Sequence, residues 1–177
     1  MLIRRFVPLA LALALAPALA PAATPPAPLA LTPADRLAAS PDVTVAPDGS
    51  VYALWVDKGL RDAPRVPPAP GQHPANYDIL VARSTDGGAS FGPAVRANAT
   101  PGEVWAFPTS RPRLVVSGTG TLHVFYTGNG TSPANGKPVL TPLYLRSDDA
   151  GRSFAASRPL APVPPGDLSS FMHGGYA

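Results

Sequence analysis

Two stretches of sequence decide the fold: ILVARSTDGGASF at residues 79–91 and PLYLRSDDAGRSF at residues 142–154. They align without a gap and share the pattern S-x-D-x-G-x-S-F. In both, a run of aliphatic or aromatic residues leads into a group of Ser, Asp and Gly. This order is typical of a strand that enters a tight turn. The chain therefore contains the same strand and turn twice.

The repeated box has a composition that stabilises its own turn. We expect the Asp carboxylate to accept hydrogen bonds from backbone donors of the turn, and a Ser hydroxyl to add a further local bond. Gly suits the left-handed backbone position, and the Phe ring is expected to point into the core. These structural roles fall to Ser84, Asp86, Gly88, Ser90 and Phe91 in the first box, and to Ser147, Asp149, Gly151, Ser153 and Phe154 in the second.

A second pair of segments repeats ahead of the boxes. PDVTVAPDGSVYALWV at residues 41–56 matches PRLVVSGTGTLHVFYT at residues 112–127, again without a gap. Each segment has two β-rich runs around a Gly-containing turn, at residues 47–49 and 118–120, which indicates a β-hairpin. Each unit then reads strand, turn, strand, long loop, strand, box and strand, in about 65 residues. We predict two four-stranded antiparallel units.

The composition excludes several classes of protein. The chain has 177 residues with 25 Pro, so long helical bundles are excluded, because an interior Pro removes a helical hydrogen bond. The absence of Cys excludes a disulfide scaffold, a thiolate zinc site and a cysteine nucleophile. His73, His123 and His173 lie far apart in the sequence without neighbouring carboxylates, so we predict no metal site and no cofactor.

The N-terminus has the pattern of a secretory signal peptide. Arg4 and Arg5 precede an apolar run at residues 6–20, and small residues follow it. The run is shorter than the roughly 20 residues that span a bilayer. We predict a signal peptide over residues 1–22, a secreted or periplasmic protein, and no membrane span after cleavage.

Residues 23–38 form a Pro/Ala-rich stretch that predicts an extended linker. Without the leader the positive and negative charges nearly balance, and no block of Lys or Arg occurs. We therefore expect no nucleic-acid partner.

Both boxes resemble the Asp-box, also called the bacterial neuraminidase repeat, of sialidases and several other β-propeller families. The resemblance covers about residues 39–160. It implies an all-β fold, an incomplete β-propeller of the six-bladed sialidase type within residues 39–177. The blade units are residues 39–98 and 105–160, and residues 168–177 would begin a third. Because two blades do not close a ring, we expect missing blades or self-association to cover the open sheet edges.

The resemblance also implies a glycan-directed function, with exo-α-sialidase-type glycoside hydrolysis if the propeller is complete. Sialidases hold the sialic acid carboxylate with an arginine of an Arg-x-Pro element in the first blade. Aligned on the turn at residues 47–49, that arginine falls at Ala39, which cannot replace a guanidinium. In another register, Arg36 or Arg111 would take this role.

The family's acid/base is an Asp in the long loop of the first blade, and its nucleophile is a Tyr assisted by a Glu. Asp57, Asp62 and Asp78 are the candidates for the acid, and each also fits a turn or surface carboxylate. Glu103 is the only Glu, and we expect a solvated loop residue or a local cap there. Tyr176 cannot be assigned as the nucleophile.

Arg111 and Asp78 thus remain the catalytic candidates, and the sequence leaves open whether the chain is an enzyme. The alternative is a noncatalytic Asp-box module for binding or structural interaction, which Ala39 favours. Glycans or glycoconjugates are the expected partners in the first case. Trp55, Trp105, Phe125 and Tyr126 are able to stack on sugar rings, although core packing explains them more readily.

Overall fold

The chain forms two antiparallel β-sheets. The computed structural model describes residues 27–60, 77–106, 110–131, 136 and 138–160, and no helix occurs among them. The first sheet contains β1 (Arg36–Val45), β2 (Val51–Leu60), β3 (Asp78–Ser84) and β4 (Val95–Arg96). The second contains β5 (Val104–Trp105), β6 (Arg113–Val116), β7 (Leu122–Thr131), β8 (Pro138–Ser147) and β9 (Arg158–Pro159).

The first sheet is a meander of neighbouring strands in the order β1-β2-β3-β4, as the repeat predicts. The turn between β1 and β2 closes where the backbone N–H of Gly49 donates to the Ala46 carbonyl over 2.9 Å. Gly49 has a φ of 81°, a left-handed conformation that glycine adopts without steric cost. The predicted hairpin at residues 47–49 is therefore confirmed.

The second sheet repeats this meander in β6, β7, β8 and β9 but has five strands, so the prediction of four is wrong for this unit. The extra strand is β5, which pairs with Thr127 and Gly128 on the same edge of β7 that β6 occupies further along. In the first sheet the single strand β1 covers the whole of that edge and passes through register shifts near Ser40. The strand number differs because two separate segments, β5 and β6, pair with β7, whereas one continuous strand pairs with β2.

The pairing registers of the two sheets are equivalent, residue by residue. One cross-strand row in the first sheet consists of Asp42, Leu54, Val81 and Val95. The matching row in the second sheet consists of Arg113, Phe125, Tyr144 and Arg158. The first two positions of these rows correspond in the alignment of the hairpin segments, and the last two correspond in the alignment of the box segments and its continuation. The strand pairing therefore agrees with both repeats found in the sequence.

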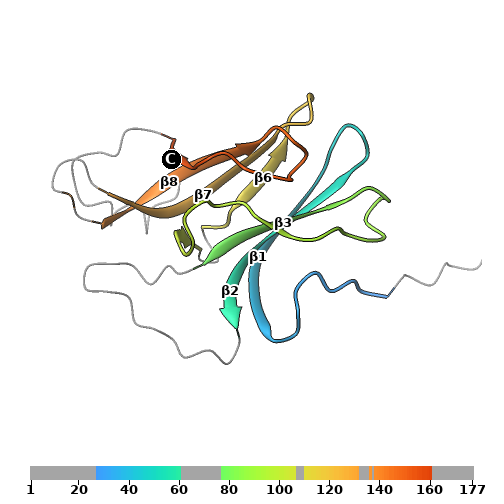
Figure 1. The fold of residues 1–177 in the computed structure, drawn as a ribbon, viewed down its shortest axis with the longest axis horizontal. Coiled ribbons are helices and arrows are strands. Elements are labelled where there is room, and N and C mark those ends of the chain that lie inside the picture. The colour runs from blue at the N-terminus through green and yellow to red at the C-terminus, as the bar shows by residue number, and fades with distance from the viewer. Residues whose placement is uncertain (1–26, 61–76, 107–109, 132–135, 137, 161–177) are drawn as a thin grey trace, which may run out of the picture.

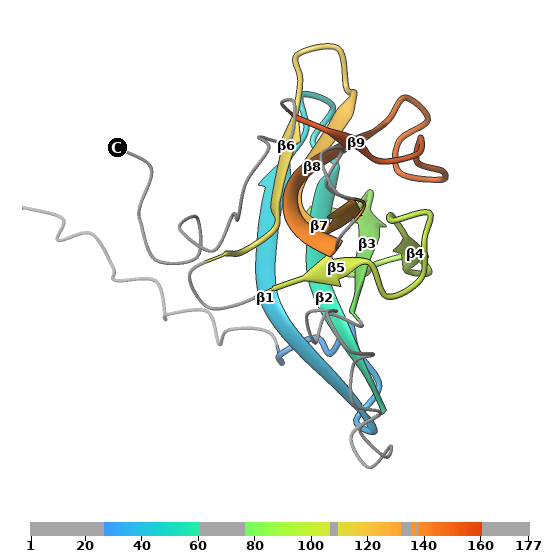
Figure 2. The same ribbon diagram turned by 90° about the vertical axis from the view of Figure 1, so that its left-hand side faces the viewer.

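The sheets stack face to face, and the main hydrophobic core lies between them (Figures 1 and 2). Leu54 and Leu122, from opposite sheets, are 1% and 0% exposed. Burying an aliphatic side chain of this size stabilises a fold by about 1.5–3 kcal/mol. The core is drawn from both sheets and consists mainly of Tyr52, Leu54, Ile79, Val81, Val104, Leu114, Leu122, Val124, Tyr126, Leu143 and Leu145.

The first meander strands of the two sheets, β1 and β6, are also joined directly. The backbone N–H of Leu114 in β6 donates to the Asp42 carboxylate of β1 over 2.8 Å. Arg113 approaches the same carboxylate at 3.7 Å. This hydrogen bond adds a specific polar contact to the core packing between the sheets.

The outer faces of the two sheets differ in how far their side chains are buried. On the first sheet, Ala53, Trp55 and Ala82 form a second buried cluster, packed against Leu31 and Phe91. β2 is therefore buried on both faces from Tyr52 to Asp57, whereas buried and half-buried residues alternate along β7.

Strand β1 begins at Arg36, inside the segment 23–38 that the sequence assigned to the linker. The predicted signal peptide and the start of a third unit at 168–177 lie outside the described residues.

Candidate functional site

The first box forms a turn held by its own side chains. The Ser84 hydroxyl donates to the Asp86 carboxylate over 2.7 Å and accepts the backbone N–H of Gly88 at 2.8 Å. Asp86 also accepts the backbone N–H and the hydroxyl of Ser90. Gly88 has a φ of 95°, and the Phe91 ring packs on the cluster around Trp55.

The second box has the same hydrogen bonds. The Ser147 hydroxyl donates to Asp149 over 2.7 Å and accepts the N–H of Gly151 at 2.9 Å, while Asp149 accepts both donors of Ser153. The Ser153 hydroxyl is the main cause that lowers the pKa of Asp149, as the Ser90 hydroxyl lowers the pKa of Asp86. Both carboxylates therefore stay ionised and support their turns.

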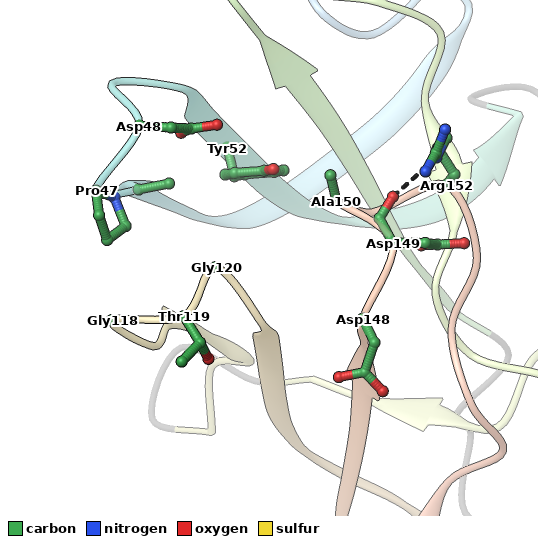
Figure 3. A pocket seen from close by; sticks show the side chains of 11 residues that line it. Pro47, Asp48, Tyr52, Gly118, Thr119, Gly120, Asp148, Asp149, Ala150 and Arg152 are labelled. Atoms are coloured by element: carbon green, nitrogen blue, oxygen red, sulfur yellow. Dashed lines mark hydrogen bonds between the residues drawn. The ribbon is translucent and has the colours of Figure 1, made fainter.

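A cavity of about 390 Å³ lies between the hairpin turns of the two sheets and the second box (Figure 3). Nothing in the sequence indicated it, because its walls come from three turns that are distant along the chain. Its lining residues include Pro47, Asp48, Tyr52, Thr119, Asp148, Asp149 and Arg152.

The carboxylates of this cavity already have donors. Asp48 accepts the backbone N–H of Ser50, which is the main cause of its lowered pKa, and pairs with Arg83 at 3.1 Å. Asp148 pairs with Arg146 at 2.8 Å. Burial raises the pKa of Tyr52. The cavity therefore combines carboxylates that already accept hydrogen bonds or ion pairs with a phenol that burial keeps protonated, which is not the arrangement of an acid and a base poised for proton transfer.

At the opposite end of the first sheet, Asp57 lies in β2 as the cross-strand partner of Asp78 in β3. Both are sequence candidates for the loop acid, and the structure brings them together on adjacent strands. Arg36 donates to both oxygens of Asp57, and this hydrogen bond is the main cause that raises the pKa of Arg36. Asp57 also accepts the backbone N–H of Gly59. One signal in the sequence favoured such a partner: Asp57 ends an otherwise apolar run.

Asp78 is held from its other side by a polar network. The Asn98 amide donates to Asp78 over 2.7 Å, and the backbone N–H of Gly102 donates over 2.9 Å. Asn98 is 1% exposed, and its oxygen accepts the backbone N–H of Ile79 at 2.7 Å. Asn98 therefore connects β3 to the loop that follows β4. The sequence contained no signal for this role.

Glu103 is buried, so the expectation of a solvated loop residue is wrong. It is 8% exposed, and it accepts the Tyr126 hydroxyl over 2.7 Å and the Ser157 hydroxyl over 3.3 Å. Burial raises the pKa of Tyr126, so this hydroxyl stays protonated and acts as a donor. The pair connects β5, β7 and the segment before β9. Trp55 and Trp105 are likewise buried.

The structure groups three of the sequence candidates, because Arg36 donates to Asp57 and Asp57 pairs with Asp78 across the strands. Arg111 is exposed and lies two residues before the start of β6. Asp62 and Tyr176 lie outside the described residues. In the part of the chain that the structure describes, no three His, Cys, Asp or Glu residues are grouped to hold a metal ion. Nor does this part contain a helix long and apolar enough to cross a membrane.

Comparison with known proteins finds no matching family model and no characterised protein that is similar in sequence. Among solved structures, a Hadza microbial sialidase has 21% identity and a TM-score of 0.48 over 70% of this chain. A protein of unknown function from Dyadobacter fermentans has 20% identity and a TM-score of 0.40 over 71% of this chain. The chain spans 26% and 36% of the lengths of these two proteins, respectively.

Proposed function

We propose that this chain supplies two consecutive blades of a sialidase-like Asp-box β-propeller. The observation that carries the proposal is the equivalence of four meander strands in each of the two stacked sheets, with the same turn between the last two strands. Asp86 and Asp149 hold these turns through identical sets of hydrogen bonds. A propeller is built by repeating such a four-stranded unit around an axis.

The proposed protein is exported and directed at glycans. The pattern of a signal peptide at residues 1–22 supports export, and the resemblance of the boxes to those of sialidases supports a glycan or glycoconjugate as partner. In a complete propeller, the reaction would be exo-α-sialidase-type hydrolysis of a glycosidic bond. Fold alone does not carry an activity, so this step depends on residues that a complete site would add.

We further propose that the chain does not hydrolyse sialosides by itself. The guanidinium of Arg36 is engaged by Asp57, and Ala39 stands at the aligned position of the carboxylate clamp. Asp78 accepts two hydrogen bonds from Asn98 and Gly102. These contacts favour the second candidate function for the isolated chain, a noncatalytic binding or structural module.

Two measurements on the purified chain test these proposals. In the first, release of the fluorophore from a 4-methylumbelliferyl sialoside is followed, and no turnover above the blank is expected. Turnover that disappears in Asp78→Asn but persists in Arg96→Gln would show that the chain is an enzyme. In the second, a sialylated trisaccharide is titrated calorimetrically. Binding without turnover supports a glycan-directed module, and absence of binding refutes that part of the proposal.

A further inference from the structure

The outer face of the second sheet carries a row of four residues, one from each of the strands β6 to β9. Arg113 in β6, Phe125 in β7, Tyr144 in β8 and Arg158 in β9 are successive cross-strand partners. Two aromatic rings thus form the middle of the row and an arginine stands at each end. We call these four residues the outer row.

The outer row is ordered by contacts within the sheet. The rings of Phe125 and Tyr144 lie 5.3 Å apart, and the Arg158 guanidinium carbon lies 4.8 Å from the centre of the Tyr144 ring. His123 stacks on Tyr144 at 5.9 Å, and its Nδ1 lies 2.8 Å from the Tyr144 hydroxyl. Both rings of the row are half-buried, and both arginines are exposed.

The charge of this face is predominantly positive. Arg158 makes no ion pair among the described residues, and its guanidinium lies over the Tyr144 ring. Arg113 is 68% exposed in its side chain, and its pairing with Asp42 is long, at 3.7 Å. Arg146 lies on the same face and is paired with Asp148. Within the part of the chain that the structure describes, Arg158 therefore carries an unpaired positive charge at one end of the outer row, and Arg113 carries a largely exposed and weakly paired one at the other.

The equivalent row of the first sheet shows what such a face does in this fold. Leu54 and Val81, at the positions of Phe125 and Tyr144, are buried against the second sheet. Asp42, at the position of Arg113, accepts a backbone N–H of that sheet. At the outer row an acceptor has been replaced by a donor. The second sheet supplies a donor to Asp42 of the first sheet. A partner that packs on the outer row in the same way must instead supply acceptors to the arginines.

We propose that the outer row is a docking surface for a polypeptide β-sheet face that is apolar in its middle and carries carboxylates at both borders. The apolar part covers Phe125 and Tyr144, and the carboxylates pair with Arg113 and Arg158. This inference rests on the proposed two-blade function and deepens it by naming the chemistry of the sheet that covers this face.

Self-pairing is disfavoured because two outer rows would bring arginines together, and like charges at an interface oppose association. Nucleic acid also combines negative charge with surfaces that stack on aromatic rings. A polypeptide is favoured over it because the equivalent face of the first sheet buries a polypeptide sheet, and because no further Lys or Arg block accompanies the row.

A charge-reversed copy of this chain provides the probe. The variant Arg113→Glu/Arg158→Glu keeps both rings and replaces each border arginine with a carboxylate, so it has the surface proposed for the partner. Wild type and variant are mixed at about 100 μM each, far above a micromolar Kd, and examined by sedimentation equilibrium. We expect a 1:1 complex in the mixture that weakens as salt is added, because salt screens exposed charges.

Two matched variants serve as controls, and thermal melting verifies that every variant is folded. Arg96→Glu/Arg152→Glu makes the same charge change at exposed arginines elsewhere, and Arg113→Gln/Arg158→Gln removes the charges without reversing them. Neither control should associate with the wild type.

Four outcomes overturn the proposal. They are the absence of a complex between wild type and the charge-reversed copy, an equal complex with either control, and a wild-type dimer that the Gln variant abolishes. The fourth is tight binding of a poly-dT oligonucleotide that the Gln variant abolishes, which would assign the face to nucleic acid.

Discussion

The two sheets share a meander of four strands in equivalent register, but the equivalent face of this meander is buried in one sheet and half-exposed in the other. In the first sheet, the row through Leu54 and Val81 is aliphatic and buried. In the second, the equivalent row through Phe125 and Tyr144 is aromatic, half-buried and bordered by arginines. The strand register is thus the same whether or not another sheet packs on this face. What differs is that the first sheet has the second as its neighbour.

The two box phenylalanines illustrate the same point. Phe154 packs against the main core between the sheets, whereas Phe91 packs on the smaller outer cluster around Trp55. The turns that carry them have the same hydrogen bonds. A repeated local structure therefore serves two different packing environments, and mutations at equivalent positions should differ in effect.

The largest difference is expected between Leu54→Ala and Phe125→Ala. Leu54 is 1% exposed in the main core, so its truncation leaves a cavity and should lower the free energy of unfolding by about 3 kcal/mol. Phe125 is the larger residue but is half-buried, and its truncation should cost only about 1 kcal/mol. Urea denaturation of both variants measures the difference. Equal losses would mean that the two faces are buried alike.

The next effect concerns Gly128 in β7. A Cβ at this position would lie 2.6 Å from Cδ1 of Leu143 and 2.9 Å from the Glu103 carbonyl oxygen. Gly128→Ala should therefore lower the free energy of unfolding by about 2 kcal/mol, because packed neighbours must move. Gly118→Ala is the control, since its Cβ would meet nothing within 4 Å. A neutral Gly128→Ala, measured by thermal melting, would contradict the close packing of β5 on β7.

Asp57 occupies the position in β2 that corresponds to Gly128 in β7, and it requires a charged partner. Arg36→Ala should lower the free energy of unfolding by about 1–2 kcal/mol, because the Asp57 carboxylate stays buried without its guanidinium. The loss is smaller than for a fully buried ion pair because the Arg36 side chain is 35% exposed to solvent. The double variant Arg36→Ala/Asp57→Asn should recover part of the loss in urea denaturation. No recovery would mean that the ion pair is not the cause.

The smallest effect is expected for the boxes, and it depends on pH. Folding lowers the pKa of Asp86 and Asp149, so their contribution to stability is present above the ordinary Asp pKa of about 4. It is lost as the pH falls from there toward the lower pKa of the folded state. The urea midpoint of the wild type should thus fall more on acidification than that of Asp86→Asn/Asp149→Asn. Asp35→Asn, at an exposed position, is the control and should behave as the wild type.

Much of the fold could be predicted from the sequence because its determinants are local. The bonds of Asp86 to Ser84 and Ser90 join close neighbours along the chain, so the residue types specify the turn by themselves. The two alignments of repeated segments likewise predicted which strands correspond, and the registers agree with them. The candidate site was less predictable. Asp57 and Asp78 were separate candidates in the sequence, and only strand pairing made them neighbours.

The sequence by itself determined the strands, the hairpin turns and the boxes, because backbone hydrogen bonds and turn-forming side chains act between residues close along the chain. Only the tertiary structure decided that β5 joins the second sheet, that Glu103 is buried against Tyr126, and which of two equivalent rows is covered. Those outcomes depend on contacts between distant segments. Their free energy comes from desolvation and packing, which the local residue pattern does not specify.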